Sequence, residues 1–236
     1  MHTRPKFLLG CIVGAVLAAM PLSATAITIT SSSSVSIDYN GFYSDAQTLI
    51  PGLTATVDLT NFTFSSVTID GQAATQVQFN YSITNTSTSP VTDSRITNFA
   101  FDTTPNILVT NLNTVTGAFT GIQTNSTQPN GIGTVEICFT AQNCPGGGSG
   151  GIGIGQTGTG SATLNFLGSI HTFDLDHSYV RYQSVACTTG ATCNASASGV
   201  PTAPTNDPPV PEPSSYVLIS SGLIGVWFMG KRRLKA

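Results

Sequence analysis

The densest group of polar side chains lies in the heptapeptide His171-Thr-Phe-Asp174-Leu-Asp176-His177. Histidine and aspartate are metal ligands and general acid–base groups. In an extended segment, however, successive side chains point to opposite faces, so the two histidines lie on one face and the two aspartates on the other. The four groups then do not converge, and we interpret the segment as a turn or solvated strand. Calcium bound by loop aspartates (Asp174, Asp176 or Asp38) stays an open alternative, although no loop has EF-hand spacing.

Two glycine-containing patterns match catalytic or cofactor motifs in their letters only. Gly153 to Gly158 fits G-x-G-x-x-G, and Gly147 to Gly151 fits G-x-S-x-G around Ser149. Both motifs need a strand–turn–helix context. Here they lie in a run from Gly146 to Gly160 in which nine of fifteen residues are glycine. We expect a mobile loop followed by a strand, and we assign no catalytic residue, no cofactor and no metal site.

Four cysteines remain once the N-terminal segment is removed. Five residues separate Cys138 from Cys144, and five separate Cys187 from Cys193. In an oxidising compartment, an even count favours two disulfides, for which three pairings are possible. We favour the two local pairings, because both intervening segments have loop composition. Zinc is the rival interpretation, but this spacing is wider than in most zinc knuckles and free thiolates oxidise outside the cell.

The elements that position these residues are strands. Val77, Phe79, Tyr81 and Ile83 alternate with polar residues, which is the period of a half-buried strand. The alternation upstream slips phase near Asn61, which predicts a bulge or bend. Asp70-Gly71 separates the two runs and predicts a tight hairpin turn. Further strands are expected at Thr28–Tyr39, Arg95–Phe101, Asn106–Thr110, Gly133–Thr140, Ser161–Leu167 and Ser178–Val185.

These patterns predict an all-β protein. Many short strands with Gly, Pro and Asn turns favour a single antiparallel β-sandwich over residues 27–199, jelly-roll-like or immunoglobulin-like. No internal segment has a helical period. About 180 residues suffice for one domain with a good core.

The body of the chain is acidic. Between Ile27 and Val210 there are ten Asp and Glu residues but only two basic residues, Arg95 and Arg181, which gives a net charge of about −8. Nucleic-acid binding needs clusters of lysine and arginine, so nucleic acid is excluded as a partner.

The N-terminus has the three parts of a secretory signal. Arg4 and Lys6 precede the apolar stretch from Phe7 to Met20, and Ala24-Thr25-Ala26 follows. Small residues at Ala24 and Ala26 form the pattern that signal peptidase cuts. Residues 1–26 are therefore predicted to be a signal peptide, with the mature chain starting at Ile27.

The C-terminus has three parts in a fixed order. Residues 200–213 form a proline-rich linker, 214–230 an apolar stretch, and 231–236 a tail with four basic residues. About 17 apolar residues extend roughly 25 Å as a helix, a short membrane span. The basic tail stays cytoplasmic by the positive-inside rule, so the body lies on the opposite side of the inner membrane from the tail.

This C-terminal order resembles the PEP-CTERM sorting signal. The residues that carry the likeness are Val210, Pro211, Glu212 and Pro213, then the apolar stretch, then Arg232 and Arg233. The resemblance implies cleavage near Pro-Glu-Pro by exosortase, a membrane-embedded cysteine transpeptidase, and only transient anchoring in the membrane. It also implies a link to extracellular polysaccharide and biofilm.

A second resemblance covers parts of the body. Arg95–Pro105, Cys138 to Cys144 with the glycine run after it, and Val180-Arg181-Tyr182-Gln183 resemble the cistern subgroup of PEP-CTERM proteins. No biochemical activity comes with this likeness.

We therefore expect a non-enzymatic exported protein whose final site is the cell surface, envelope or extracellular matrix. The alternative is a carbohydrate-binding or adhesive sandwich that keeps its helix as a permanent membrane anchor. A secreted hydrolase would need paired carboxylates in a cleft, and the ten acids are scattered along the body.

Overall fold

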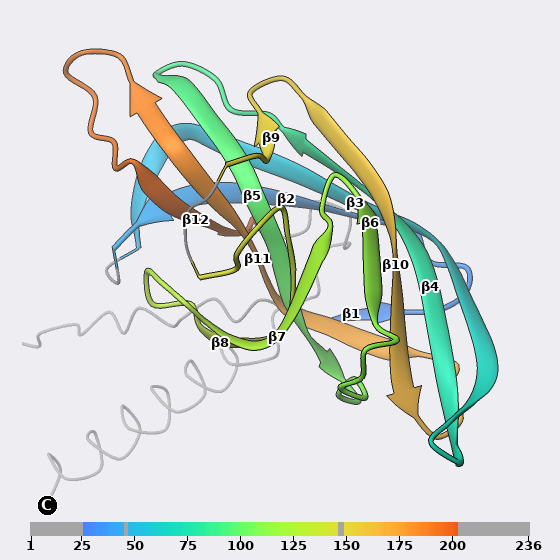
Figure 1. The fold of residues 1–236 in the computed structure, drawn as a ribbon. Helices are drawn as coiled ribbons and strands as arrows, with labels where there is room; N and C mark the ends of the chain where they lie inside the picture. The colour runs from blue at the N-terminus through green and yellow to red at the C-terminus, as the bar shows by residue number, and fades with distance from the viewer. Residues whose placement is uncertain (1–25, 45–46, 146–148, 203–236) are drawn as a thin grey trace, which may run out of the picture.

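The computed structural model describes residues 26–44, 47–145 and 149–202, and this part of the chain consists of twelve β-strands and no helix (Figure 1). The strands of the first half are β1 (Ile27–Ile29), β2 (Val35–Tyr43), β3 (Thr48–Ile69), β4 (Gln72–Asn85), β5 (Val91–Thr104) and β6 (Thr114–Gly117). Those of the second half are β7 (Gly121–Gln128), β8 (Gly133–Thr140), β9 (Ile152–Gly153), β10 (Thr157–Leu167), β11 (Phe173–Cys187) and β12 (Ser196–Pro201). The all-β prediction is confirmed.

All strand pairs are antiparallel and belong to one continuous sheet. Its order is β6-β10-β4-β3-β2-β12-β11-β5-β8-β7, with β1 added beside β11 and β9 beside β5. The sheet curls so that its two halves face each other, as Figure 1 shows. The first layer consists of β6, β10, β4, β3 and β2, and the second of β12, β11, β5, β8 and β7. The two layers of the predicted sandwich are joined through the β2–β12 pair.

The main core fills the space between the two layers. Ring contacts cross it: Phe79 of β4 lies 6.3 Å from Phe139 of β8, and Phe166 of β10 lies 5.2 Å from Phe173 of β11. These four rings are at most 2% exposed. Aromatic side chains supply large apolar areas, so their burial between the layers stabilises the curled sheet.

The turn and the bulge predicted in the first half are both present. Asp70 and Gly71 connect β3 to β4 with φ of 50° and 78°. Positive φ at both central residues matches the right-handed twist of a hairpin, and Asp-Gly adopts it readily. The phase slip appears as a register shift between Thr60 and Thr63, where Asn61 has a φ of 58°.

Three sequence-based expectations for strands and loops need correction or extension. Residues 106–110 form no strand; Ile107 makes only an isolated bridge to Phe166. Strands β6, β7 and β12 were not expected, because they are rich in Ser, Thr and Gly and have no apolar alternation. The glycine run is not simply a mobile loop, since Ile152 in β9 pairs with β5 and is 4% exposed. A strand does follow the run, at Thr157.

A hairpin of β7 and β8 covers the outer face of the second layer. The side chain of Asn130 at its tip donates to the hydroxyl of Ser198 in β12 at 3.1 Å. A second buried cluster lies beneath it, which includes Phe42, Ala100 and Tyr179. The outer face of this layer therefore carries a second set of buried apolar side chains under the hairpin.

The predicted targeting segments fall largely outside the described residues. Residues 1–25, including Ala24, and residues 203–236 lie outside the described residues. The second range contains the predicted membrane segment and basic tail. Ala26 is exposed directly before β1. Val200 and Pro201, placed in the linker by composition, pair with Asn40 and Tyr39 of β2. No helix suited to crossing a membrane occurs in the described part of the chain.

Candidate functional site

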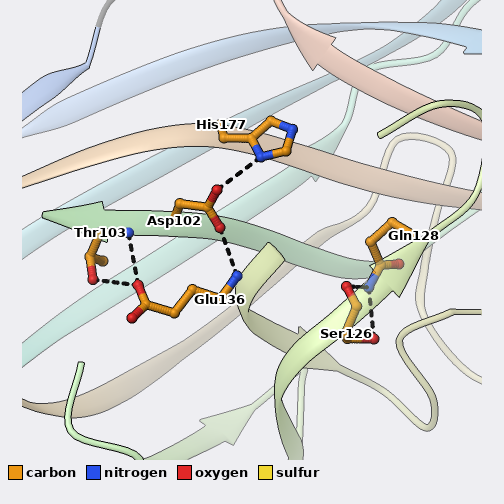
Figure 2. Close-up of polar contacts among 6 residues, drawn as sticks. All are labelled: Asp102, Thr103, Ser126, Gln128, Glu136 and His177. Carbon is orange, nitrogen blue, oxygen red and sulfur yellow. Dashed lines mark hydrogen bonds and ion pairs between the residues drawn. The ribbon is translucent and has the colours of Figure 1, made fainter. Parts of the chain in front are cut away.

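Three carboxylates come together where β5, β8 and β11 meet. Asp102, Glu136 and Asp176 line a hollow of about 340 Å³. The other lining residues are mainly hydroxyl and amide side chains, including Thr103, Asn106, Asn125 and Thr134. Figure 2 shows the polar contacts at the side of this hollow.

Glu136 is a largely buried carboxylate that binds backbone and hydroxyl donors. Its Oε2 accepts hydrogen bonds from the backbone N–H of Thr103 at 2.9 Å and from the Thr103 hydroxyl at 2.6 Å. Its Oε1 accepts the backbone N–H of Ile107 at 2.8 Å. Only 9% of Glu136 is exposed. The carboxylate therefore holds β8 against the end of β5 and against the segment that follows β5, which also meets β10 at the isolated bridge between Ile107 and Phe166.

Asp102 connects Glu136 to a histidine. Its Oδ1 accepts the backbone N–H of Glu136 at 2.6 Å, and its Oδ2 lies 2.9 Å from Nδ1 of His177 (Figure 2). His177 has a φ of 46° within the register shift between Asp176 and Tyr179. No partner for His177 is evident from the sequence alone, because Asp102 is 75 positions away. The bulge in β11 brings the pair together.

The four polar residues of the heptapeptide do not form one site. Asp174 accepts the hydroxyl hydrogen of Thr28 in β1 at 2.7 Å, whereas His177 contacts Asp102. His171 is exposed before β11 begins. Asp38, the third aspartate considered for calcium, accepts the hydroxyl of Thr56 at 2.7 Å. Within the ranges that the structure describes, no group of three or more His, Cys, Asp and Glu side chains is arranged to hold a metal ion.

The His177–Asp102 pair lacks the third partner of a catalytic triad. Nucleophilic catalysis needs a hydroxyl or thiol within hydrogen-bond reach of the histidine. Among the hydrogen bonds of residues 26–44, 47–145 and 149–202, His177 is joined only to Asp102. The arrangement orients the imidazole, and within the described residues no hydroxyl or thiol is hydrogen-bonded to it.

A second polar group is buried beneath the β7–β8 hairpin, and the sequence patterns did not predict it. Arg181 is 5% exposed; its two terminal nitrogens donate to the hydroxyls of Ser198 (3.2 Å) and Ser196, and its Nε has no partner. Burial lowers the pKa of the Arg181 guanidinium and raises the pKa of the Tyr179 phenol, whose hydroxyl is also unpaired.

The hairpin itself adds a buried amide. The side-chain N–H₂ of Gln128 donates to the carbonyl of Ser126 at 3.2 Å and to its hydroxyl at 2.9 Å (Figure 2), while Gln128 Oε1 has no partner. Sequence alternation did not predict that Arg181, Tyr179 and Gln128 are buried together, because the sequence does not show that the hairpin folds over the sheet.

The cysteines form the two local disulfides that the spacing favoured. Cys138 pairs with Cys144, and Cys187 pairs with Cys193. The first pair is fully buried and lies in the second cluster, whereas the second pair is half-buried. The side-chain N–H₂ of Asn98 donates to the Cys144 carbonyl at 2.6 Å, which fixes the first loop to β5.

The comparison with protein families concerns the C-terminal end. Residues 209–233 match the family described as the PEP-CTERM protein-sorting motif. The chain carries a PEP-CTERM sorting signal. The matched range contains the residues singled out for this role, which are Val210, Pro211, Glu212, Pro213, Arg232 and Arg233, and they lie outside the described residues. The comparisons with curated proteins and with solved structures give no significant match.

The PEP-CTERM motif has direct consequences for the route of the protein. It implies an exported chain that is anchored transiently in a membrane, is processed by exosortase-type machinery and reaches the cell surface. The motif covers residues 209–233 only, so it identifies how the protein is handled and not what the β-domain does.

Proposed function

We propose that this protein is a non-enzymatic surface or matrix protein that associates with extracellular polysaccharide. Signal peptidase removes residues 1–26, residues 214–230 hold the chain in the inner membrane, and exosortase cuts near Pro211-Glu212-Pro213. The observation that carries the proposal is the sorting motif at residues 209–233. The low charge and the many hydroxyl side chains of the body fit a location outside the cell.

The N-terminal geometry supports cleavage after Ala26. Ala26 is exposed, and the next residue, Ile27, is the first residue of β1. Ile29 at the other end of this short strand is fully buried. A cut after Ala26 leaves all of β1 in the domain.

The carboxylate cluster supports a non-enzymatic role. A general acid or base must exchange its proton with a substrate. Both oxygens of Glu136 and both oxygens of Asp102 already contact groups of the protein itself. These contacts give Glu136 and Asp102 a structural task, which is to join β5, β8 and β11.

A second candidate is a permanently anchored carbohydrate-binding or adhesive domain. The observation that favours it is the polar outer face of β3, β4 and β10, where many hydroxyl and amide side chains are exposed. The two candidates differ in whether the mature protein keeps its C-terminal helix.

Mass spectrometry of the mature C-terminus separates them. In a strain with an exosortase-type transpeptidase, we expect the mature protein to lack residues 231–236. Glu212→Ala should retain them, because it removes the charge in the recognised motif. The matched control Asp207→Ala, an acid in the same proline-rich segment, should be processed normally. A mature protein with an intact tail would contradict exosortase processing and favour the anchored candidate.

The polysaccharide association has its own test. The protein should co-fractionate with matrix polysaccharide and be released when that polysaccharide is digested enzymatically. Release into the medium without digestion would contradict the association and leave the processing route untouched.

A further inference from the structure

The outer face of the first layer is an array of hydroxyl and amide side chains in register. Asp58 of β3 pairs with Ser82 of β4, which pairs with Thr159 of β10. In the next row, Thr60, Asn80, Ser161 and Thr116 follow one another across β3, β4, β10 and β6. Neighbouring strands lie about 4.8 Å apart, so each row is a line of evenly spaced polar groups.

The array faces away from the core. Val57, Leu59, Phe79 and Tyr81 alternate with the array residues along β3 and β4, and each is at most 2% exposed. The array residues themselves are half-buried or exposed. The alternation is therefore complete: apolar side chains face the core, and the outward positions of these rows are Ser, Thr, Asn and Asp.

The centre of the array is hollowed. Asp58, Asn80, Ser82, Thr159 and Ser161 take part in lining a hollow of about 480 Å³ that also reaches Thr116 of the edge strand β6. This volume falls within the range of small-molecule sites. Ser82 and Ser161 are short, which leaves room between the longer residues.

The side chains in the hollow differ from their neighbours in their hydrogen bonding. At the rim, Thr84 bonds to Thr157 at 2.8 Å, and Thr116 bonds to Ser161 at 3.0 Å. The hydroxyl of Tyr81 donates to the Thr116 carbonyl at 2.8 Å. Within the described residues, the other five polar lining residues make no side-chain hydrogen bond to the protein: Asp58, Thr60, Asn80, Ser82 and Thr159. Their donors and acceptors are available to a ligand.

Charge and composition select the class of ligand. None of the strands β2, β3, β4, β6 and β10 contains lysine or arginine, and the face carries the carboxylates of Asp58 and Asp38. A polyanion would meet repulsion without a compensating cation. A protein partner would need apolar or aromatic anchors, which are not among the outward residues of these rows. A neutral polyhydroxyl chain matches both the donors and the acceptors.

We propose that this hollow is a binding site for a segment of neutral polysaccharide, with Asn80, Ser82, Thr159 and Asp58 as hydrogen-bonding residues. The inference rests on the proposed association with extracellular polysaccharide and assigns that association a site. The carboxylate of Asp58 accepts sugar hydroxyl hydrogens, and the amide of Asn80 both donates and accepts.

The test measures binding of the purified full chain to dextran, galactomannan and xyloglucan as neutral probes and to alginate as a polyanion, by affinity electrophoresis and calorimetry. We expect retention by at least one neutral probe and none by alginate. The double variant Asn80→Ala/Ser82→Ala should bind at least tenfold more weakly. The double variant Ser66→Ala/Thr68→Ala removes similar exposed polar surface from β3 outside the hollow and should bind as the wild type does.

A further variant distinguishes weaker binding by a folded protein from weaker binding caused by unfolding. Thr159→Val replaces a hydroxyl by a methyl group of similar size at a strand position that favours branched residues, so folding is retained. It should also weaken binding. No neutral probe retained, preference for alginate, or equal binding by the hollow variants and the control would overturn the inference. Matrix co-fractionation that persists in the hollow variants would overturn this site while the proposed association stands.

Discussion

At the scale of single residues, the carboxylate of Glu136 has the largest structural role that the sequence did not suggest. It accepts three hydrogen bonds from Thr103 and Ile107, and the residue is only 9% exposed. Hydrogen bonds to a buried charge are stronger than neutral ones, and their donors are left unsatisfied when the acceptor is lost. Glu136 therefore adds to the short backbone pairing with β10 that Ile107 and Leu108 make beyond the end of β5.

This role predicts a large effect of a small change. Glu136→Gln should lower the free energy of unfolding by about 3 kcal/mol, because an N–H₂ group replaces an oxygen that accepts hydrogen bonds. Urea unfolding followed by circular dichroism measures the change. The matched variant Asp93→Asn, on an exposed residue of β5, should stay within about 0.5 kcal/mol of the wild type. Equal effects of both variants would show that the Glu136 contacts contribute nothing specific.

At the scale of elements, the two disulfides close loops of equal length in unequal surroundings. Both join cysteines six positions apart. In the chain-entropy account, equal loops restrict the unfolded chain equally, by about 2 kcal/mol each. Cys138 and Cys144 also pack under the β7–β8 hairpin, whereas Cys187 and Cys193 lie at the partly exposed end of β11.

Removal of the two bridges should therefore have different costs. Cys187→Ala/Cys193→Ala should lose about 2 kcal/mol of stability, the loop contribution alone. Cys138→Ala/Cys144→Ala should lose about 4 kcal/mol, because buried sulfur contacts are lost as well. Chemical denaturation of both variants provides the comparison, and each serves as the control for the other. Equal losses would indicate that the second cluster adds no stability through this bridge.

At the scale of the whole molecule, the burial of tyrosine side chains makes the free energy of unfolding depend on pH in the alkaline range. Burial raises the pKa of Tyr39, Tyr179 and Tyr182 above the ordinary tyrosine value. The unfolded chain releases these protons near pH 10, while the folded chain retains them. The unfolded state then binds fewer protons, so the free energy of unfolding falls as pH rises above about 10 and is unaffected below it.

Two tyrosine variants test this coupling. Tyr179→Phe should reduce the slope of stability against pH above about 10 by up to about 1.4 kcal/mol per pH unit. It should be nearly neutral at pH 7, because the Tyr179 hydroxyl has no partner. Tyr39→Phe should reduce the slope similarly but cost about 1 kcal/mol at pH 7, because the Tyr39 hydroxyl donates to Ser178 at 2.8 Å. Urea titrations at pH 8 to 11 give the slopes. Slopes parallel to the wild type would contradict the coupling.

The amino-acid sequence by itself determined the features that depend on neighbouring residues. Alternation of Val77, Phe79, Tyr81 and Ile83 predicted β4, since side-chain direction in a strand has a period of two. Asp70-Gly71 predicted the hairpin turn from backbone preferences, the equal cysteine spacing favoured local disulfides, and the C-terminal order of residues predicted the sorting signal.

Only the tertiary structure decided what depends on distant pairing. The curl of the sheet through β2 and β12, the hairpin over Arg181, and the bulge that joins His177 to Asp102 bring together residues far apart in the chain. The rows of Asp58, Ser82 and Thr159 likewise exist because register aligns three strands. Polar residues of this kind carry no pairing information in the sequence, because any of several registers would leave them equally solvated.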